Sequence, residues 1–437
     1  MKKTILKLPV FIFSLACLAA SGHALAEENP ITGKDKHMGV ATCASSVCHG
    51  KPAPDANSYA LLNEYRTWSR EDLHSKAYKI LFNAESKRMA KNLGLASAHT
   101  ADICLDCHAD NVPQSQRGPK FVIRDGVGCE ACHGGSEKWL DSHYKKGVTH
   151  AENLAVGMYP TESPKPRAEM CLSCHLGTKD KFATHRIMGA GHPRLAFELE
   201  TFTANQPAHY VVDQDYLERK GQIESVTMWV AGVYYTAKQT LELYNSHLLT
   251  ANGMIPELSF YDCHACHHPM DKKTWRQTSI EIGLKPGDLR LNDAALQMLV
   301  GIAYIRDQEG AQRLLQLSRD LHVASRKDVN SLRSSAKAAL AELASMEVAL
   351  LDRNYSSNEI NSLRQRILSK SAAGQYRDYT SAEQAFLGVE TLTLALNQSE
   401  RYSAQMDSFY ASLASESAFQ QGRFASVAKN LLSTMYP

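Results

Sequence analysis

The chain has 437 residues, enough for two or three domains, and a formal net charge of +2 from 48 basic and 46 acidic side chains. This near-balance gives the chain little of the net positive charge that is typical of nucleic-acid binding, so we expect no nucleic-acid partner. The 11 cysteines are the most informative feature of the composition, because ten of them fall in one repeated pattern.

The first 26 residues are typical of a cleaved export signal. Its positive residues are Lys2, Lys3 and Lys7, its apolar segment is residues 8–20, and its cleavage box is Ala24-Leu25-Ala26. The mature chain is then expected to start at Glu27, in the periplasm. The apolar segment is too short to span a bilayer easily, and no other segment of spanning length follows, so we expect no stable membrane insertion.

Two alternatives for the location stay open. Cys17 would allow a lipid anchor, but Ser14 stands where a lipobox usually has leucine. An extracellular location is also compatible with an export signal.

The ten cysteines of the mature chain form five copies of one motif. Four copies have the spacing C-x-x-C-H, and the first copy has two extra residues between its cysteines. In chain order, the motif residues are Cys43, Cys48 and His49; Cys104, Cys107 and His108; Cys129, Cys132 and His133; Cys171, Cys174 and His175; and Cys263, Cys266 and His267. C-x-x-C-H is the attachment site of c-type haem, whose vinyl groups bond the thiols and whose iron takes the histidine as its proximal ligand. The sequence therefore predicts five covalently attached haem c groups.

Zinc binding and disulfides are the alternatives, since paired C-x-x-C also binds zinc. Neither requires a histidine directly after every second cysteine. The composition of the chain predicts about 0.01 chance copies of C-x-x-C-H, far fewer than are present. We therefore favour haem at all five motifs, which leaves no mature cysteine for another role.

Residues 61–93, between the first two motifs, are predicted as helix from apolar residues at near-helical spacing. These residues are Trp68, Leu73, Ala77 and Leu81. His74 lies on this segment. Residues 109–128 are rich in glycine and proline and are predicted as turns, with a short extended piece at 121–123.

A strong amphipathic helix is predicted at 223–249, where Asn252-Gly253 then ends it just before the fifth motif. Beyond Pro286-Gly287 the composition changes, with no cysteine and no proline until Pro437. We expect about six helices there, packed as a bundle.

Two local patterns support this bundle. One helical stripe consists of Ala336, Ala339, Leu343, Met346 and Leu350. The segment Thr380-Ser-Ala-Glu383 is a predicted capping box, so we expect a helix to begin there.

These elements predict a mainly α protein, with a multihaem cytochrome domain of little sheet followed by an α-helical bundle. The expected divisions are a signal peptide at 1–26, a tetrahaem cytochrome domain at 27–220, a unit of long helix and fifth haem at 221–287, and a haem-free bundle at 288–437. We expect the bundle to fold by itself and to dock a partner or another copy of the chain.

Beyond the haem motifs themselves, residues 37–200 resemble the tetrahaem cytochrome c-554 family, which is related to hydroxylamine oxidoreductase. The resemblance rests on four segments in matching order and approximate spacing. They are Thr67-Trp68-Ser-Arg-Glu-Asp-Leu-His74-Ser-Lys-Ala, Gly126-Val-Gly-Cys129-Glu-Ala-Cys132-His133-Gly134, Asp141-Ser-His143-Tyr-Lys-Lys-Gly and Cys171-Leu-Ser-Cys174-His175-Leu.

The resemblance implies a mainly helical electron-transfer protein with closely packed haems. It implies that His74 is the distal ligand of the fourth haem and His143 that of the first, and that the second haem is five-coordinate. Three features depart from the family: the longer first motif, the fifth motif and the long helical C-terminal domain.

Five distal histidines would give each of the five irons a second histidine ligand. To His74 and His143 we add His37, His192 and His268 as candidates. His37 lies just before a motif, His192 lies in a glycine-flanked turn, and His268 follows a proximal histidine and is able to reach a neighbouring iron only. His322, in the bundle, is predicted to be structural.

Two functions fit these residues. The first is an electron-transfer protein that relays single electrons between redox proteins as donor and acceptor. The alternative is a multihaem reductase or oxidase of small nitrogen or sulfur oxyanions, which needs a five-coordinate haem with acid–base groups beside it. Related pentahaem nitrite reductases use C-x-x-C-K at the active haem, whereas all five motifs here end in histidine. A structural subunit of a haem filament is a third hypothesis.

The motif at Cys104, Cys107 and His108 is the predicted place of an open haem, if one exists. No histidine follows it closely, although His99 lies five residues upstream. The charged residues that would stand at the rim of this haem are Asp106, Asp110 and Arg117.

Overall fold

The computed structural model describes residues 29–30, 32–55, 60–221, 224–251, 253, 256–263, 266–267, 284 and 288–437. The predicted export signal, the Pro286-Gly287 pair at the expected boundary and the candidate ligand His268 lie outside these residues. Across the described ranges there is no strand, and the only pairing is two isolated bridges, so the predicted mainly α fold is confirmed. The extended piece expected at 121–123 forms no strand.

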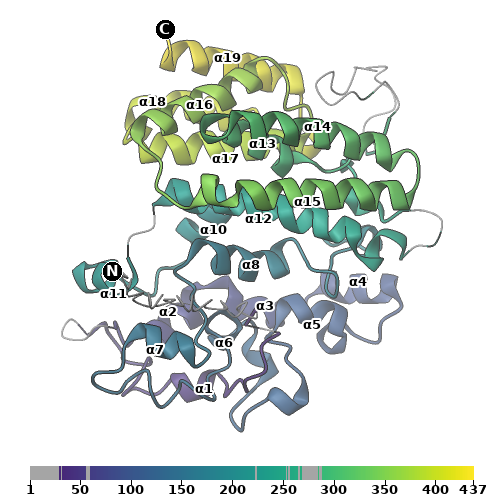
Figure 1. The fold of residues 1–437 in the computed structure, drawn as a ribbon. Coiled ribbons are helices and arrows are strands. Elements are labelled where there is room, and N and C mark those ends of the chain that lie inside the picture. Colours follow the sequence, from purple (N-terminus) through teal and green to yellow (C-terminus); the bar gives the residue numbers. More distant parts are fainter. Residues whose placement is uncertain are drawn as a thin grey trace, which may run out of the picture.

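The N-terminal part of the chain folds into short helices joined by loops. They are α1 (Val40–Cys43), α2 (Glu64–Glu71), α3 (Ala77–Ile80), α4 (Ala84–Leu93), α5 (Asp102–His108), α6 (Glu130–His133), α7 (His150–Ala155), α8 (Pro164–His175), α9 (His185–Gly189), α10 (Leu199–Asn205) and α11 (Gln214–Lys220). Figure 1 shows these helices together below the layer that α12 and α15 form.

The single helix predicted at 61–93 is broken into three, because two polar side chains bond the backbone. Asp72 ends α2 and caps the turn that follows, since its side chain accepts from the backbone N–H of His74. Asn83 caps α4 by accepting from Ser86, and Gly94 ends α4 at a φ of 73°. These breaks place His74 on a short turn rather than in the middle of a helix.

The longer helices follow. They are α12 (Ser225–Asn245), α13 (Ala294–Arg306), α14 (Gln308–Ser325), α15 (Val329–Leu351), α16 (Ser357–Ala372), α17 (Tyr379–Ala395), α18 (Ser399–Ala411) and α19 (Gln421–Met435). The predicted stripe from Ala336 to Leu350 is confirmed, because all five of its residues are buried on α15. The capping prediction is wrong by two residues: Asp378, not Thr380, caps α17, accepting from Ser381 while also pairing with buried Arg290.

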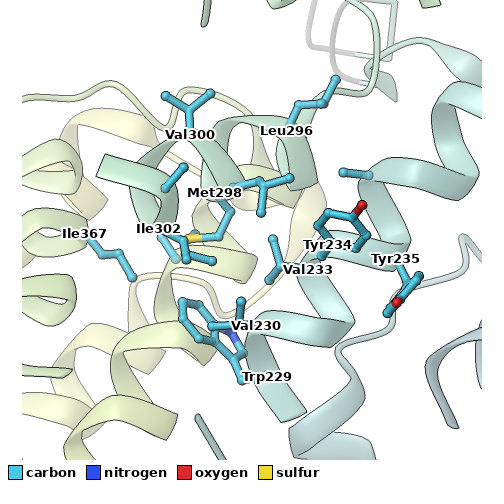
Figure 2. Close-up of a cluster of buried hydrophobic side chains, with 14 of the residues drawn as sticks. Trp229, Val230, Val233, Tyr234, Tyr235, Leu296, Met298, Val300, Ile302 and Ile367 are labelled. Carbon is cyan, nitrogen blue, oxygen red and sulfur yellow. The ribbon is translucent and has the colours of Figure 1, made fainter. Parts of the chain in front are cut away.

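The helix α12 is the centre of the largest hydrophobic core. Its side chains Trp229, Val230 and Val233 lie among residues of α13 and beside Ile367 of α16 (Figure 2). Its other side packs on α8 and α10, so α12 joins the long helices to the part of the chain that holds the motifs.

The expected boundary near residue 287 does not divide this core. The predicted unit at 221–287 grouped the long helix with the fifth motif, whereas α12 shares one continuous apolar cluster with α13 to α19. The turn residues and composition mark a change in the chain, but the apolar face of α12 needs the later helices to cover it.

Within the described part of the chain, no helix combines the length and apolar character needed to cross a bilayer.

Candidate haem centres

The motif spacing and the helices fit each other. In three copies the motif forms the last turn of a helix: α5, α6 and α8 end at His108, His133 and His175. Residues at i, i+3 and i+4 share one face of a helix, so both cysteines and the histidine of C-x-x-C-H point to the same side. That is the arrangement required to bind one flat cofactor through three atoms.

The longer first motif is closed by the same backbone hydrogen bond as the C-x-x-C-H copies. In the tight copies, the histidine N–H donates to the carbonyl of the first cysteine, at 2.9 Å for His133 and 2.7 Å for His267. In the first motif, His49 makes the same bond to the Cys43 carbonyl at 3.1 Å. The two extra residues therefore bulge outward, with Val47 81% exposed, and do not separate the ends of the motif.

Each motif histidine faces a second histidine. The distances between ring centres are 6.1 Å for His49 and His143, 6.4 Å for His108 and His192, 6.2 Å for His133 and His209, 6.1 Å for His175 and His74, and 6.2 Å for His267 and His185.

This spacing matches what one iron between two imidazoles requires. A metal–nitrogen bond to histidine is about 2.0 Å long and the ring nitrogen lies about 1.1 Å from the ring centre, so the two centres lie about 6 Å apart. Direct stacking would bring ring centres closer, as it does for Phe82 and His99 at 4.3 Å. In each of the five pairs, the two rings are thus far enough apart for one iron to fit between them, so the pairs fit haem.

In five of these ten rings the Nδ1 atom is engaged by the protein. Each of five rings bonds an oxygen through Nδ1: His49 with Glu64 (2.9 Å), His74 with Asp72 (2.8 Å), His108 with the Ala77 carbonyl (3.2 Å), His143 with the Leu140 carbonyl (2.7 Å) and His192 with the Pro193 carbonyl (2.8 Å). Because carboxylate and carbonyl oxygens only accept, Nδ1 carries the proton and Nε2 is left as the ligand atom.

Burial keeps two of the motif histidines neutral, which is the state that binds a metal. Burial lowers the pKa of His133 to about 3, with nearby His209 and Lys220 adding to the effect. Burial, with a smaller effect from His74, lowers the pKa of His175 to about 4.

The predicted distal ligands fall into three groups. His74, His143 and His192 each face a motif histidine, so the structure brings them to positions where a distal ligand belongs. His268 lies outside the described residues. His37 faces no motif histidine.

We therefore correct the prediction that His37 binds iron. Its ring is fully buried, its Nδ1 bonds Asp110 at 2.7 Å and its Nε2 bonds the Pro30 carbonyl at 3.3 Å. Both ring nitrogens are engaged with oxygen atoms, so neither is left for a metal.

The sequence reasoning missed His185 and His209. His185 follows Thr184, which caps α9, much as His74 follows the capping residue Asp72. His209 follows Pro207 in the loop after α10. A histidine next to a helix cap or a proline in a short connection is the signal that would have found both.

The motifs lie next to one another in a definite order. The thiols of Cys43 and Cys129 are near enough for each to shift the pKa of the other, and so are those of Cys107 and Cys174. The first motif thus adjoins the third, and the second adjoins the fourth. Gln206 bonds Asp72 at 2.9 Å, which ties the loop that carries His209 to the turn that carries His74.

The candidate rim residues of the second motif are engaged in the protein. Asp110 bonds His37, and Asp106 accepts from the Asn111 amide at 2.7 Å. Arg117 donates to the Val112 carbonyl at 2.9 Å.

The alternatives to haem gain no support from the geometry. All ten cysteines in the described residues are free thiols. The same part of the chain contains no group of three or more Cys, His, Asp or Glu side chains arranged around a metal position, as a zinc ribbon would require.

Helix-borne Cys-Cys-His motifs, each with a second histidine opposite, define the class of multihaem c-type cytochromes. Within this class the chain is c-554-like: residues 42–134 match the family described as cytochrome c554 and c-prime. It is also similar to cytochrome c-554 of Nitrosomonas europaea, with 29% identity over 168 residues, which are 36% of this chain and 62% of that protein. The chain thus spans less than two thirds of the length of that relative, and no solved structure matches it.

Proposed function

We propose that this protein is a periplasmic electron-transfer protein that carries five covalently attached haem c groups and passes single electrons between other redox proteins. Haem iron with two histidine ligands supplies one-electron chemistry and changes its coordination little between the two oxidation states. The resemblance to cytochrome c-554 supports the class, and the predicted export signal supports the compartment.

One observation carries the proposal. The ring centre of every motif histidine lies 6.1 to 6.4 Å from that of a second histidine, the spacing that one iron bound between two imidazoles requires. Ten histidines supply two ligands for each of five irons, so the chain offers no vacant coordination position to a substrate. Saturated irons favour a relay over catalysis, because a reacting substrate needs such a position.

The neighbours of these histidines prepare them to bind metal. The carboxylates of Glu64 and Asp72 accept from Nδ1 of His49 and His74, which holds the rings in place and raises the basicity of Nε2. Backbone carbonyls orient His108, His143 and His192 without added charge. This difference gives the haem sites unequal surroundings, and therefore unequal reduction potentials.

The alternative of a reductase or oxidase has no such support. It required an open iron at the second motif with acid–base groups at its rim, but His108 faces His192 and the Asp110 carboxylate is occupied by His37. Donor and acceptor are instead expected to be redox proteins that bind weakly and transiently. Docking of a partner or a second copy on the long helices stays a prediction.

Intact-mass spectrometry of the exported protein tests the haem count. We expect a chain that begins at Glu27 and carries five additions of about 0.6 kDa each. The double variant Cys43→Ser, Cys48→Ser should carry four, because only the first motif is lost. Four additions on the unmodified chain would contradict attachment at the longer motif.

A redox titration and a turnover assay test the function itself. All haems should be reduced and reoxidised reversibly in one-electron steps. With a chemical electron donor, nitrite, hydroxylamine and sulfite should give no sustained turnover. Sustained turnover of any of them would overturn the relay in favour of the enzyme.

A further inference from the structure

The short helix α9 and the turn after it present histidines in two directions. His185 is the first residue of α9 and faces His267 of the fifth motif, with ring centres 6.2 Å apart. His192 lies three residues beyond the end of α9 and faces His108 of the second motif, with ring centres 6.4 Å apart. One segment of eight residues therefore reaches two different motifs.

This segment is held firmly at both ends. Thr184 caps α9 by accepting from Ile187, and the backbone N–H of His185 donates to Glu257 at 2.6 Å. After α9, Gly191 adopts a φ of 121°, which lets the chain turn back so that His192 leaves in a new direction.

The end of α4 holds the same segment from the side. Arg186 donates to the Leu93 carbonyl at 2.8 Å, and the Asn92 amide donates to the Ala190 carbonyl at 3.1 Å. Ile187, Ala190 and Leu93 form a small apolar cluster of their own. The positions of both histidines are therefore set by packing between two helices and not by a free loop.

A cavity of about 270 Å³ lies beside this segment. On one side it is lined by Ile103, next to Cys104, and by Leu95; on the other it is lined by Thr184 and Ile187, which flank His185. The cavity therefore adjoins both the start of this segment and α5, the helix that carries the second motif.

We propose that the segment from His185 to His192 supplies the distal ligand to two haems, with His192 closing the second and His185 closing the fifth. The proposal rests on the proposed function, since it assumes that both motifs carry haem. The resemblance to the tetrahaem family implied an open second haem, and His192 removes that opening.

The same segment sets how far apart these two haems lie. Five residues of helix followed by three extended residues separate the two histidine Cα atoms by at most about 17 Å. The fifth haem is therefore a direct neighbour of the second. The first motif lies beside the third, the Gln206–Asp72 bond links the third to the fourth, and the fourth lies beside the second. The fifth haem would then come next to the second, at the end of this series.

The spin state of each iron tests this directly, without any assay of activity. The unmodified protein should show five low-spin haems in its EPR and resonance Raman spectra. His192→Ala should convert one haem of the five to high spin, and His185→Ala should also convert one. His99→Ala is the matched control, because His99 stacks on Phe82 and faces no motif histidine, and it should leave all five low-spin.

The ring angles divide the five haems into two kinds, because three pairs are near-perpendicular, at 80° to 86°, and two are nearer to parallel, at 15° and 34°. Near-perpendicular axial rings give a more anisotropic low-spin signal than near-parallel rings. The rings of His108 and His192 are at 80°, whereas those of His185 and His267 are at 34°. His192→Ala should therefore remove one of the three anisotropic signals, and His185→Ala one of the two rhombic signals. Added imidazole should restore the low-spin state in both variants, which separates a lost ligand from a misfolded chain.

Three results would overturn the inference. One is a high-spin haem in the unmodified protein that His192→Ala leaves unchanged, and another is a His192→Ala variant with five low-spin haems. The third is fewer than five haems by mass, which also defeats the proposed function. A five-haem protein with an open second iron defeats this inference alone.

Discussion

Whether a histidine is free to bind iron depends on the hydrogen bonds that its two ring nitrogens make. Rings bonded only through Nδ1, such as His143 and His192, keep Nε2 free to face a motif histidine. His37 bonds acceptors through both nitrogens, so it carries both protons and a positive charge beside Asp110. The same residue type is thus left with a free Nε2 in one place and forms a buried ion pair in another.

The His37–Asp110 pair should stabilise the folded protein. Burial alone would lower the pKa of His37, but the hydrogen bond and charge of Asp110, with help from Glu130, raise the pKa above its ordinary value of 6.5. His37→Ala leaves the Asp110 carboxylate buried without its partner, and we expect a loss of about 3–5 kcal/mol in the free energy of unfolding near pH 6. Urea unfolding of the holoprotein, followed by circular dichroism, measures it.

The pH dependence of this loss has a definite sign. A group whose folded pKa is raised contributes fully below its unfolded pKa, near 6.5, and its contribution disappears as the pH rises through the folded value. The difference in the free energy of unfolding between the unmodified protein and His37→Ala should therefore become smaller above neutral pH. His247→Ala, at an exposed position, is the control and should change stability little. A difference that becomes larger with pH would contradict the charged pair.

At the scale of elements, the N-terminus of α16 is where three long helices are joined. Ser356 and Glu359 form a capping box, in which Ser356 accepts from the Glu359 N–H and Glu359 accepts from Ser356. Glu359 also accepts from Arg306, the last residue of α13, at 3.0 Å, and from Arg353, just after α15. One carboxylate therefore ties a helix start to two helix ends.

Glu359→Gln should weaken this junction in a pH-dependent way. Burial alone would raise the pKa of Glu359, but bonds from Ser356, Arg353 and Arg306 outweigh it and lower the pKa to about 2. Because the folded pKa is depressed, its contribution is present above the ordinary value of 4.5 and is lost as the pH falls toward 2. We expect a loss of about 1–2 kcal/mol at pH 7, measured by thermal unfolding, that shrinks below pH 4.

The matched control is Glu400→Gln, at an exposed position of α18. It should leave the melting temperature nearly unchanged at both pH values. Equal losses for Glu359→Gln at pH 7 and pH 3 would show that the carboxylate charge contributes nothing.

At the scale of the whole molecule, α12 decides which part of the chain folds alone. The helix α13 is buried nearly all round, and α12 is one of the helices that cover it. A fragment of residues 288–437 would expose that face of α13. The bundle should therefore need residues 224–287 as well, which revises the domain predicted at 288–437.

Two fragments of the chain test whether residues 288–437 fold alone or also need residues 224–287. With Cys263→Ser and Cys266→Ser, residues 224–437 should be helical and unfold cooperatively in urea. Residues 288–437 should unfold with little cooperativity and bind a hydrophobic dye. Trp229→Ala in the longer fragment should cost about 3–5 kcal/mol, since Trp229 is fully buried in the shared core. Cooperative folding of the shorter fragment would restore the original boundary.

The sequence by itself determined the features that depend on neighbouring residues. The C-x-x-C-H spacing sets three atoms on one helix face, so the motifs at His108, His133 and His175 were evident without a structure. The stripe on α15 was evident for the same reason, because helical periodicity is local. The first motif needed the structure, because only the bond from His49 to Cys43 shows that its extra residues bulge outward.

The family resemblance already placed His74 opposite the fourth motif and His143 opposite the first, but only the tertiary structure decided which histidines lie opposite the other three. The rings of His133 and His209 come from distant parts of the chain and meet because loops fold back across the motifs. Nearness in sequence favoured His37, whose ring points instead to Asp110. The burial of α12 was likewise decided by the tertiary structure, since the change of composition after Pro286-Gly287 is a local signal, whereas the helices that cover α12 follow it much later in the chain.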